Sequence, residues 1–254
     1  MGISRGNITT NIIKSGLVFN MDAANRASTI PKSNVTVIKD TVNNITGSVN
    51  NEYDIWEGPT TASFSLDGND DYIDFESFSE IAGLYALTVS VWFKSSTITN
   101  LGAGNARLID CKQITIKQAS ALYSNTQGRF IYSFLSNPSS IPLFTFGGGS
   151  QYGSIQACDG NWHNLCCTYD ANTAKAIVYE DGIDGLNQSN DVTAPGGSTL
   201  QLDQTIGDLV IGAQASNKNN EIIGNIGPVH IYNRALSAKE VLFNYNGLKS
   251  RFGL

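Results

Sequence analysis

The stretch LTVSVWFK, residues 87–94, alternates between apolar side chains and a second, more polar set. In an extended strand, successive side chains point to opposite faces. One face here carries Leu87, Val89, Val91 and Phe93. The other carries Thr88, Ser90, Trp92 and Lys94. The pattern predicts a strand with one face in a core and the other partly wet. On that second face, we expect Trp92 to pack against a neighbouring strand or loop rather than serve as a platform for a ligand.

Many other short runs are rich in β-branched and aromatic residues and are separated by Gly, Asn, Asp, Ser or Pro. Such runs predict strands over residues 16–23, 63–68, 71–75, 107–112, 129–136, 142–147, 164–170, 176–181, 209–213 and 227–233. The segment 34–50 has room for a short edge strand. This density of strands predicts an all-β fold, a sandwich or barrel.

One helix is expected near the C-terminus. Ser237 and Glu240 have the spacing of a capping box, and Leu236 and Val241 that of a hydrophobic staple. Gly247 is placed to end the helix. A short amphipathic helix beside a sandwich is expected to cover a sheet, so we predict a structural cap.

Composition favours one domain and excludes several functions. The chain has 254 residues, 41% of them hydrophobic, which is enough for a full core. A net charge of −6 leaves no basic stripe, which excludes nucleic-acid binding. We expect no membrane insertion and no export signal, since no apolar run approaches the length of a membrane span. Residues 1–15 are predicted to form an extended arm available to a neighbouring subunit, and 16–254 the domain.

The four cysteines are too few for a disulfide framework in a chain of this length. Cys166 and Cys167 are adjacent in a strand-like run and must point to opposite faces. We predict free, mostly buried thiols, with a disulfide involving Cys111 or Cys158 as the alternative.

The stretch DGNDDYIDF, residues 67–75, concentrates four carboxylates in what reads as a turn between two strands. Asp67 and Asp70 are explained by turn chemistry, and Asp74 by a solvated outer face. Asp71 has the inward parity of Ile73. We therefore expect Asp71 at the rim of the sandwich, with its charge met by backbone N–H groups or by an ion.

Each of the two histidines is interpreted as structural. His163 precedes a buried-looking run and is expected to be a hydrogen-bonded strand residue rather than a base. His230 alternates with Val229 and Ile231, so it is expected to face solvent or a neighbouring subunit.

Several segments together resemble the laminin G-like branch of the concanavalin A-like lectin/glucanase superfamily. They are DGNDDYI (67–73), NWHNLCCTYD (161–170), VYEDG (178–182) and IYNRALSAKE (231–240). The resemblance covers roughly residues 16–248 and implies a jelly roll of two antiparallel sheets. The last segment also looks like versions of this domain in virion proteins of tailed bacteriophages.

That resemblance implies a non-enzymatic structural or decoration protein of a virion, on the capsid, neck, tail or fibre. Its implied partners are other virion proteins and further copies of itself, together with host-surface glycans. Tyr53, Trp56 and Tyr152 lie in polar loops and are the candidate glycan platforms. No cofactor is expected, although relatives often hold calcium at one rim. A calcium site here would combine Asp71 with carboxylates of remote loops, such as Asp159, Asp203 or Asp208.

Two alternatives remain open, namely a polysaccharide-degrading glycoside hydrolase and a bacterial carbohydrate-binding adhesin. Glucanases of this superfamily resemble one another in an E-x-D-x-E or E-x-D-x-x-E strand that supplies the two carboxyls of the reaction. The nearest match here is DYIDFESFSE (71–80), where Asp74 and Glu76 share a face but no leading Glu exists. We therefore predict that the protein is not an enzyme.

Overall fold

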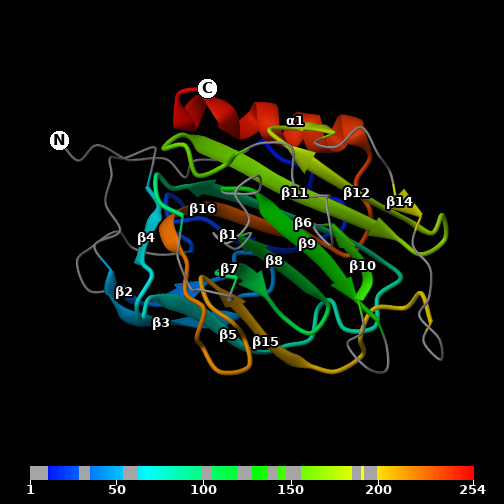
Figure 1. The fold of residues 1–254 in the computed structure, drawn as a ribbon, viewed down its shortest axis with the longest axis horizontal. Helices are drawn as coiled ribbons and strands as arrows, with labels where there is room; N and C mark the ends of the chain where they lie inside the picture. The colour runs from blue at the N-terminus through cyan, green and yellow to red at the C-terminus, as the bar shows by residue number, and fades with distance from the viewer. Residues whose placement is uncertain are drawn as a thin grey trace.

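The computed structural model describes residues 11–28, 35–53, 62–98, 105–118, 128–136, 142–146, 156–184, 190–191 and 199–254, without the side chains of residues 35, 52–53, 142–146, 184 and 190–191. Within these ranges the chain forms two packed antiparallel sheets and one C-terminal helix (Figure 1). The predicted all-β jelly roll with a short C-terminal helix is confirmed.

The first sheet, called sheet A, has eight strands, of which six run in the order β1-β16-β6-β11-β12-β13. Strand β14 pairs with β12, and β4 pairs with β16. The bounds are β1 Leu17–Met21, β4 Phe64–Asp67, β6 Ala86–Lys94, β11 Trp162–Asp170, β12 Lys175–Glu180, β13 Ile183–Asp184, β14 Asn190–Asp191 and β16 Ile223–Tyr232. The alternating stretch 87–94 is thus a central strand, held between β16 and β11.

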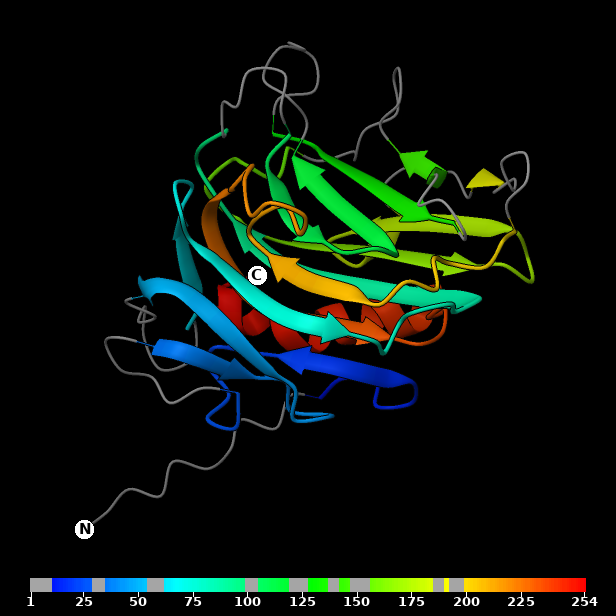
Figure 2. The same cartoon turned by 90° about the horizontal axis from the view of Figure 1, so that it is seen from below.

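The second sheet, called sheet B, also has eight strands, in the order β10-β9-β8-β7-β15-β5-β3-β2. The bounds are β2 Val35–Lys39, β3 Thr46–Tyr53, β5 Tyr72–Phe78, β7 Arg107–Asp110, β8 Ile114–Gln118, β9 Phe130–Leu135, β10 Pro142–Phe146 and β15 Gly207–Ile211. Figure 2 shows its blue, cyan, orange and green strands side by side. The sequence predicted one short edge strand within residues 34–50, where the structure has both β2 and most of β3, and it did not predict β8.

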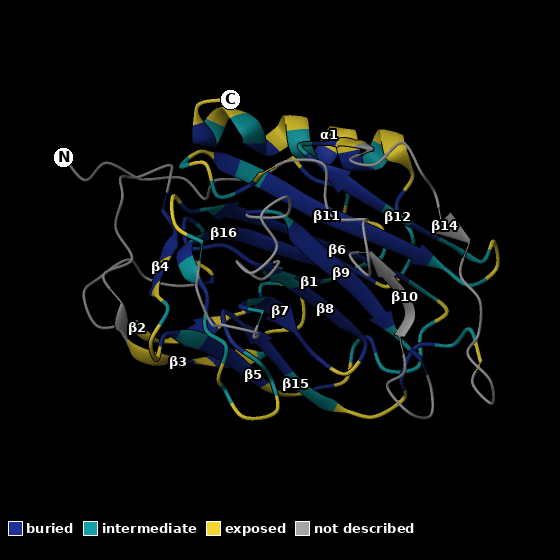
Figure 3. Ribbon diagram, viewed as in Figure 1, coloured by how far each residue is buried: buried dark blue, intermediate teal, exposed yellow. Residues whose placement is uncertain are grey.

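One hydrophobic core fills the space between the sheets. All four residues of the predicted inward face of β6 are fully buried in it. Aromatic rings interlock at the centre: Phe19 of β1 meets Phe75 of β5 edge-on at a centroid distance of 4.8 Å. Phe93 meets Phe130 in the same way at 5.4 Å. Figure 3 shows most of the described strand residues buried and the exposed ones on loops, on β2 and β3 and on the outer side of the helix.

The outer face of sheet A is covered by helix α1, Ala238–Leu248, and by the 3₁₀ turn η1, Lys249–Phe252. Trp92 points to this face and is completely buried. Its ring stacks on Tyr245 at 5.5 Å and on Phe252 at 4.5 Å. Packing of Trp92 is therefore confirmed, but the expected wet face is wrong, because the C-terminal segment covers it.

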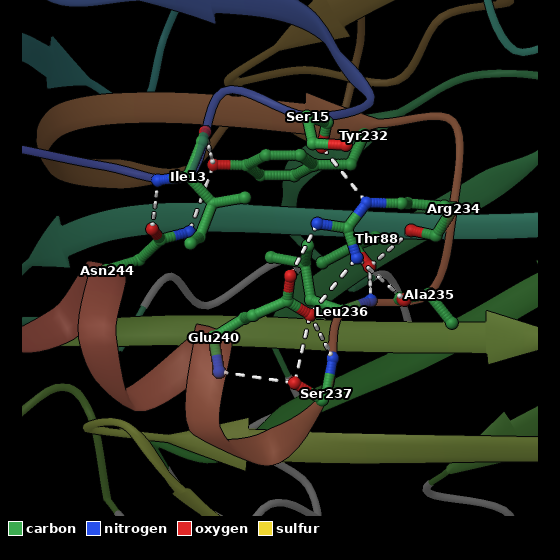
Figure 4. Close-up of polar contacts among 10 residues, drawn as sticks. All are labelled: Ile13, Ser15, Thr88, Tyr232, Arg234, Ala235, Leu236, Ser237, Glu240 and Asn244. Atoms are coloured by element: carbon green, nitrogen blue, oxygen red, sulfur yellow. Dashed lines mark hydrogen bonds and ion pairs between the residues drawn. The ribbon is translucent and has the colours of Figure 1, made fainter.

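The motif IYNRALSAKE, residues 231–240, attaches this helix to sheet A (Figure 4). The predicted capping box of Ser237 and Glu240 is present, and Leu236 and Val241 share one buried cluster. Glu240 also receives both terminal nitrogens of Arg234, at 3.0 and 2.6 Å. The Thr88 hydroxyl of β6 donates to the Arg234 carbonyl at 2.7 Å and accepts from the Leu236 N–H at 2.9 Å. These contacts tie the helix start to the central strand.

Residues 11–15 lie along the helix as an ordered segment. The N–H of Ile13 donates to the side chain of Asn244 at 2.8 Å, and the Asn244 amide donates to the Tyr232 hydroxyl at 3.0 Å. Tyr232 in turn donates to the carbonyl of Ile13 at 3.1 Å, which closes a circuit. Residues 11–15 of the predicted arm thus contact this chain's own helix, and residues 1–10 lie outside the described ranges.

Gly247 does not end the helix, which continues to Leu248 and then into η1, where Gly253 adopts the left-handed conformation. A Cβ at position 247 would collide with the carbonyl oxygen of Asn11. This glycine is needed for close approach of the N-terminal segment rather than for termination.

The turn predicted in DGNDDYIDF is present, but the two strands that it joins do not pair with each other. β4 pairs with β16 in sheet A, whereas β5 lies between β3 and β15 in sheet B. The turn 68–71 is therefore a crossover between the two sheets. In contrast, YEDG (179–182) does form a hairpin, between β12 and β13, with φ of 54° at Asp181 and 78° at Gly182.

All four cysteines are free, and three of them are buried. Cys166 packs under the helix and Cys167 in the main core, as their adjacent positions in β11 require. Burial raises the pKa of the Cys166 thiol to about 12. Among the described residues there is also no helix long and apolar enough to cross a membrane.

Candidate functional site

The crossover turn holds Asp71 at the rim of the sandwich, as predicted. Its side chain is 7% exposed, and one carboxylate oxygen accepts the backbone N–H of Asp67 at 2.8 Å. Burial raises the pKa of the Asp71 carboxyl, and this hydrogen bond opposes the rise. Asp67 and Asp70 are exposed. Asp67 accepts from the N–H of Asn69 at 2.9 Å, and Asp70 from the amide of Asn51.

Asp67, Asp70 and Asp71 each bring a carboxylate oxygen to within 4.8 Å of the other two. Calcium takes six to eight oxygen ligands, so three carboxylates supply an incomplete set. One oxygen of each is already engaged in shaping the turn. Turn chemistry therefore accounts for the described contacts here, and a metal at Asp71 stays a prediction.

Asp74 has the predicted outward parity but is not solvated. It is 7% exposed, and one oxygen pairs with the ammonium group of Lys218 at 2.8 Å. Lys218 also pairs with Asp208 at 2.9 Å. Burial raises the pKa of Asp74, which Lys218 partly offsets. The expectation failed because Lys218 belongs to a distant loop that folds over this part of the sheet.

The three candidate glycan platforms cannot be placed. Trp56 and Tyr152 lie outside the described residues, and Tyr53 is described only as backbone at the end of β3. Of the remote partners proposed for calcium, Asp159 and Asp208 pair with His163 and Lys218, while Asp203 accepts from the Thr205 N–H at 2.7 Å. None of these three belongs to the carboxylate cluster of the crossover turn.

Both histidines are structural, although one prediction about them was wrong. His163 lies between Asp181 at 2.8 Å and Asp159 at 3.1 Å. These carboxylates raise the pKa of His163 against the opposing effect of burial. His230 does not face solvent: it is 2% exposed beneath the C-terminal segment, and burial lowers its pKa to about 4.

The outer face of sheet B carries a row of cross-strand neighbours whose side chains point away from the core. The register places them opposite one another on five adjacent strands, in the order Ser133, Thr115, Asp110, Val210 and Asp74. Four of the five are polar. No described helix covers this face, because α1 lies on sheet A. The outer face of sheet B is therefore mainly polar along this row.

A pocket of about 430 Å³ opens on this face. Its floor comes from β7 and β8, and its walls from β15 and the following loop. Seven of its eleven lining residues have polar side chains, including Arg107, Asp110, Thr115, Asp208, Gln214 and Ser216. Asp110 fixes the shape: it accepts the Thr115 hydroxyl at 2.7 Å and the Ala215 N–H at 2.8 Å.

Positive charge collects beside this pocket. Arg107 of β7 and Lys117 of β8 are direct cross-strand partners. Burial lowers the pKa of Lys117, the positive charge of Arg107 lowers it further, and Asp110 acts in the opposite direction. The Nε of Arg107 is buried and has no hydrogen-bond partner in the described part of the chain.

Apart from Asp208, which was named as a possible calcium ligand, none of these pocket residues was predicted from the sequence to bind a ligand. A usable signal exists in QITIKQ (113–118), where Thr115 and Lys117 alternate with Ile114 and Ile116. That alternation indicates a strand with a polar outer face. The pairing of this strand with β7, which creates the pocket floor, is not encoded in any local pattern.

Solved structures with similar folds come from several protein classes. The binding domain of Paraclostridial Mosquitocidal Protein 1 superposes with a TM-score of 0.61 at 17% identity, over 91% of this chain and 52% of that chain. Domain 4 of the extracellular arabinanase AbnA from Geobacillus stearothermophilus, solved with arabinotriose, gives 0.58 at 16%, over 92% and 100%. Trypanosoma rangeli sialidase, solved with 2,3-difluorosialic acid, gives 0.57 at 15%, over 94% and 34%.

This chain thus spans about half of the toxin binding domain, all of the arabinanase domain and a third of the sialidase. Identities this low establish the shared fold alone. No curated protein sequence matches the chain. Residues 67–242, more than half of the sequence, match the Laminin_G_3 family. The chain therefore belongs to this family of the concanavalin A-like lectin/glucanase superfamily.

Proposed function

We propose that this protein is a non-enzymatic, lectin-like recognition domain that binds host-surface glycans through the sheet B pocket. The observation that carries the proposal is the pocket itself. Its volume of about 430 Å³ suits a short saccharide, and its lining offers a hydroxyl, an amide, carboxylates and a guanidinium. The arabinanase domain solved with arabinotriose supports a sugar-binding use of this fold.

A binding role is favoured over hydrolysis by the state of the carboxylates. Hydrolysis needs one carboxyl that gives a proton and a second that attacks or activates water. In the pocket, both oxygens of Asp110 accept hydrogen bonds from the protein, and Asp208 is paired with Lys218. Asp74, the nearest match to a glucanase carboxylate, is buried against the same lysine.

We further propose that the domain is a structural or decoration component of a tailed-bacteriophage virion, assembled there as a symmetric homo-oligomer. The support is the family membership together with the motif IYNRALSAKE, which resembles virion versions of the domain. Mass spectrometry of purified virions would detect the chain. Its absence from virions, with recovery on a bacterial surface, would instead favour an adhesin.

Blocking the pocket tests the binding role. Ser216→Trp places a bulky side chain at an exposed lining position. We expect it to abolish binding on an array of bacterial envelope oligosaccharides. Ser250→Trp, at an exposed position of η1 on the opposite side, is the matched control and should bind normally. Release of reducing sugar by the wild type would refute the non-enzymatic role.

A further inference from the structure

The charge pattern of the pocket suggests what kind of glycan it takes. The chain as a whole is acidic, with a net charge of −6. Yet Arg107 of β7 lines the pocket, and its cross-strand partner Lys117 of β8 lies beside it. Like charges directly opposite one another on a sheet are destabilising. The Arg107–Lys117 pair therefore lowers the stability of the fold, and we look to ligand binding for its role.

Three acidic groups lie near this pair, and two of them are paired with another cation. Asp110 uses its two oxygens for Thr115 and for the N–H of Ala215. Asp208 is bound by Lys218 at 2.9 Å and by the N–H of Ser77 at 3.3 Å. Asp74 is held by the same lysine. Asp208 and Asp74 are thus paired with Lys218, whereas Asp110 offsets only part of the positive charge of the Arg107–Lys117 pair.

Arg107 supplies a second, independent observation. Its Nε is buried and lacks a hydrogen-bond partner among the described residues. A buried donor left without an acceptor lowers the stability of the fold. An acceptor arriving with the ligand would remove that cost, and arginine binds carboxylates particularly well because its planar fork can donate two parallel hydrogen bonds.

We propose that the pocket selects anionic saccharides, and that Arg107, assisted by Lys117, binds the carboxylate of an acidic sugar. This rests on the glycan-binding function proposed above and narrows its ligand class. The hydroxyl and amide groups of Thr115, Gln214 and Ser216 would then contact the sugar ring or its neighbours. Uncharged saccharides should bind weakly, because they bring no negative charge to Arg107 and Lys117.

Matched probes separate charge from sugar shape. Binding would be measured by calorimetry for oligogalacturonate and its methyl ester, and for sialyllactose, sulfated lactose and lactose. Esterification removes the negative charge and keeps the ring, so the acidic member of a pair should bind at least tenfold more tightly. Raising the salt concentration should weaken that binding, since ionic contacts are screened.

Variants test the two residues. Arg107→Gln should weaken binding of the acidic probe at least tenfold, and Lys117→Gln to a smaller degree. Arg107→Lys keeps the charge without the planar fork and should fall between the wild type and Arg107→Gln. Lys239→Gln, at an exposed position of the helix on sheet A, removes the same charge far from the pocket and should bind as the wild type does.

The possible outcomes separate the preference for anionic saccharides from glycan binding itself. Equal binding of acidic and neutral probes, or full binding by the folded Arg107→Gln variant, would overturn the anionic preference and leave glycan binding standing. A preference for sulfated lactose over both carboxylated probes would overturn the assignment of a carboxylate. Failure of every probe and of the envelope array to bind would overturn the glycan function together with this inference.

Discussion

The two outer faces of the sandwich differ in what they hold. On sheet A, Trp92 is stacked between Tyr245 and Phe252, and Asn244 joins the N-terminal segment to the sheet. On sheet B, a pocket remains, with a buried Arg107 nitrogen that no described residue satisfies. The comparison teaches that the chain's own C-terminal segment closes one face, whereas the other keeps a pocket, at which we propose that glycans bind.

The sharpest test of this division is Trp92→Ala. Removing a fully buried ring from between two aromatic partners should lower the free energy of unfolding by about 3 to 5 kcal/mol. Urea unfolding followed by circular dichroism measures the loss. Tyr85→Ala, at a side chain that is 54% exposed, is the control and should change stability by less than about 0.5 kcal/mol. A loss below about 1 kcal/mol for Trp92→Ala would show that the stacking of Trp92 on the C-terminal segment contributes little to stability.

Acid should weaken the sheet A side through His230. Its pKa is about 4 in the folded protein and 6.5 when unperturbed, so protonation favours the unfolded chain. The stability gained from a neutral His230 is complete above pH 6.5 and is lost as the pH falls toward 4, by roughly 3 kcal/mol in total. Lys14, Asp22 and Arg251 surround it and contribute the remaining charge effects.

His230→Gln provides the comparison for that pH dependence. The variant cannot gain this proton, so its unfolding free energy should fall less steeply than that of the wild type between pH 6.5 and pH 4. Urea unfolding at a series of pH values gives both curves. Parallel curves would mean that His230 is not the group responsible.

A smaller effect is expected where the N-terminal segment is attached. Asn244→Ala removes both the acceptor for Ile13 and the donor to Tyr232, which should cost about 1 to 3 kcal/mol. Hydrogen exchange should also accelerate in residues 11–15. Asn246→Ala, at an exposed position of the same helix, should do neither. Unchanged exchange in Asn244→Ala would show that other contacts suffice to hold the segment.

On sheet B, the corresponding change should have almost no cost. Arg107→Gln relieves repulsion of Lys117, so stability should stay within about 0.5 kcal/mol of the wild type or rise slightly. Thermal unfolding measures it, with Lys239→Gln as the charge-matched control. A loss of more than about 1 kcal/mol would give Arg107 a structural role and remove the contrast between the faces.

The sequence was sufficient for features governed by local alternation and caps. Leu87, Val89 and Phe93 are buried as their spacing predicts, and Ser237 caps its helix. It was insufficient wherever the deciding partner is remote. Parity placed Asp74 on the outer face but could not reveal Lys218, which buries it. For the same reason, the pocket was missed, because it requires the register between two strands rather than a motif within one.

The position of the N-terminal segment and of η1 also bears on the side from which another protein can be joined to the domain. Residues 11–15 and the C-terminal turn η1 both lie on the sheet A side, where Ile12 and Phe252 share one buried cluster. A carrier fused to the C-terminal Leu254 would therefore approach the molecule from that side. The pocket would then point away from the carrier toward the surrounding medium, an orientation built into the fold before any partner is present.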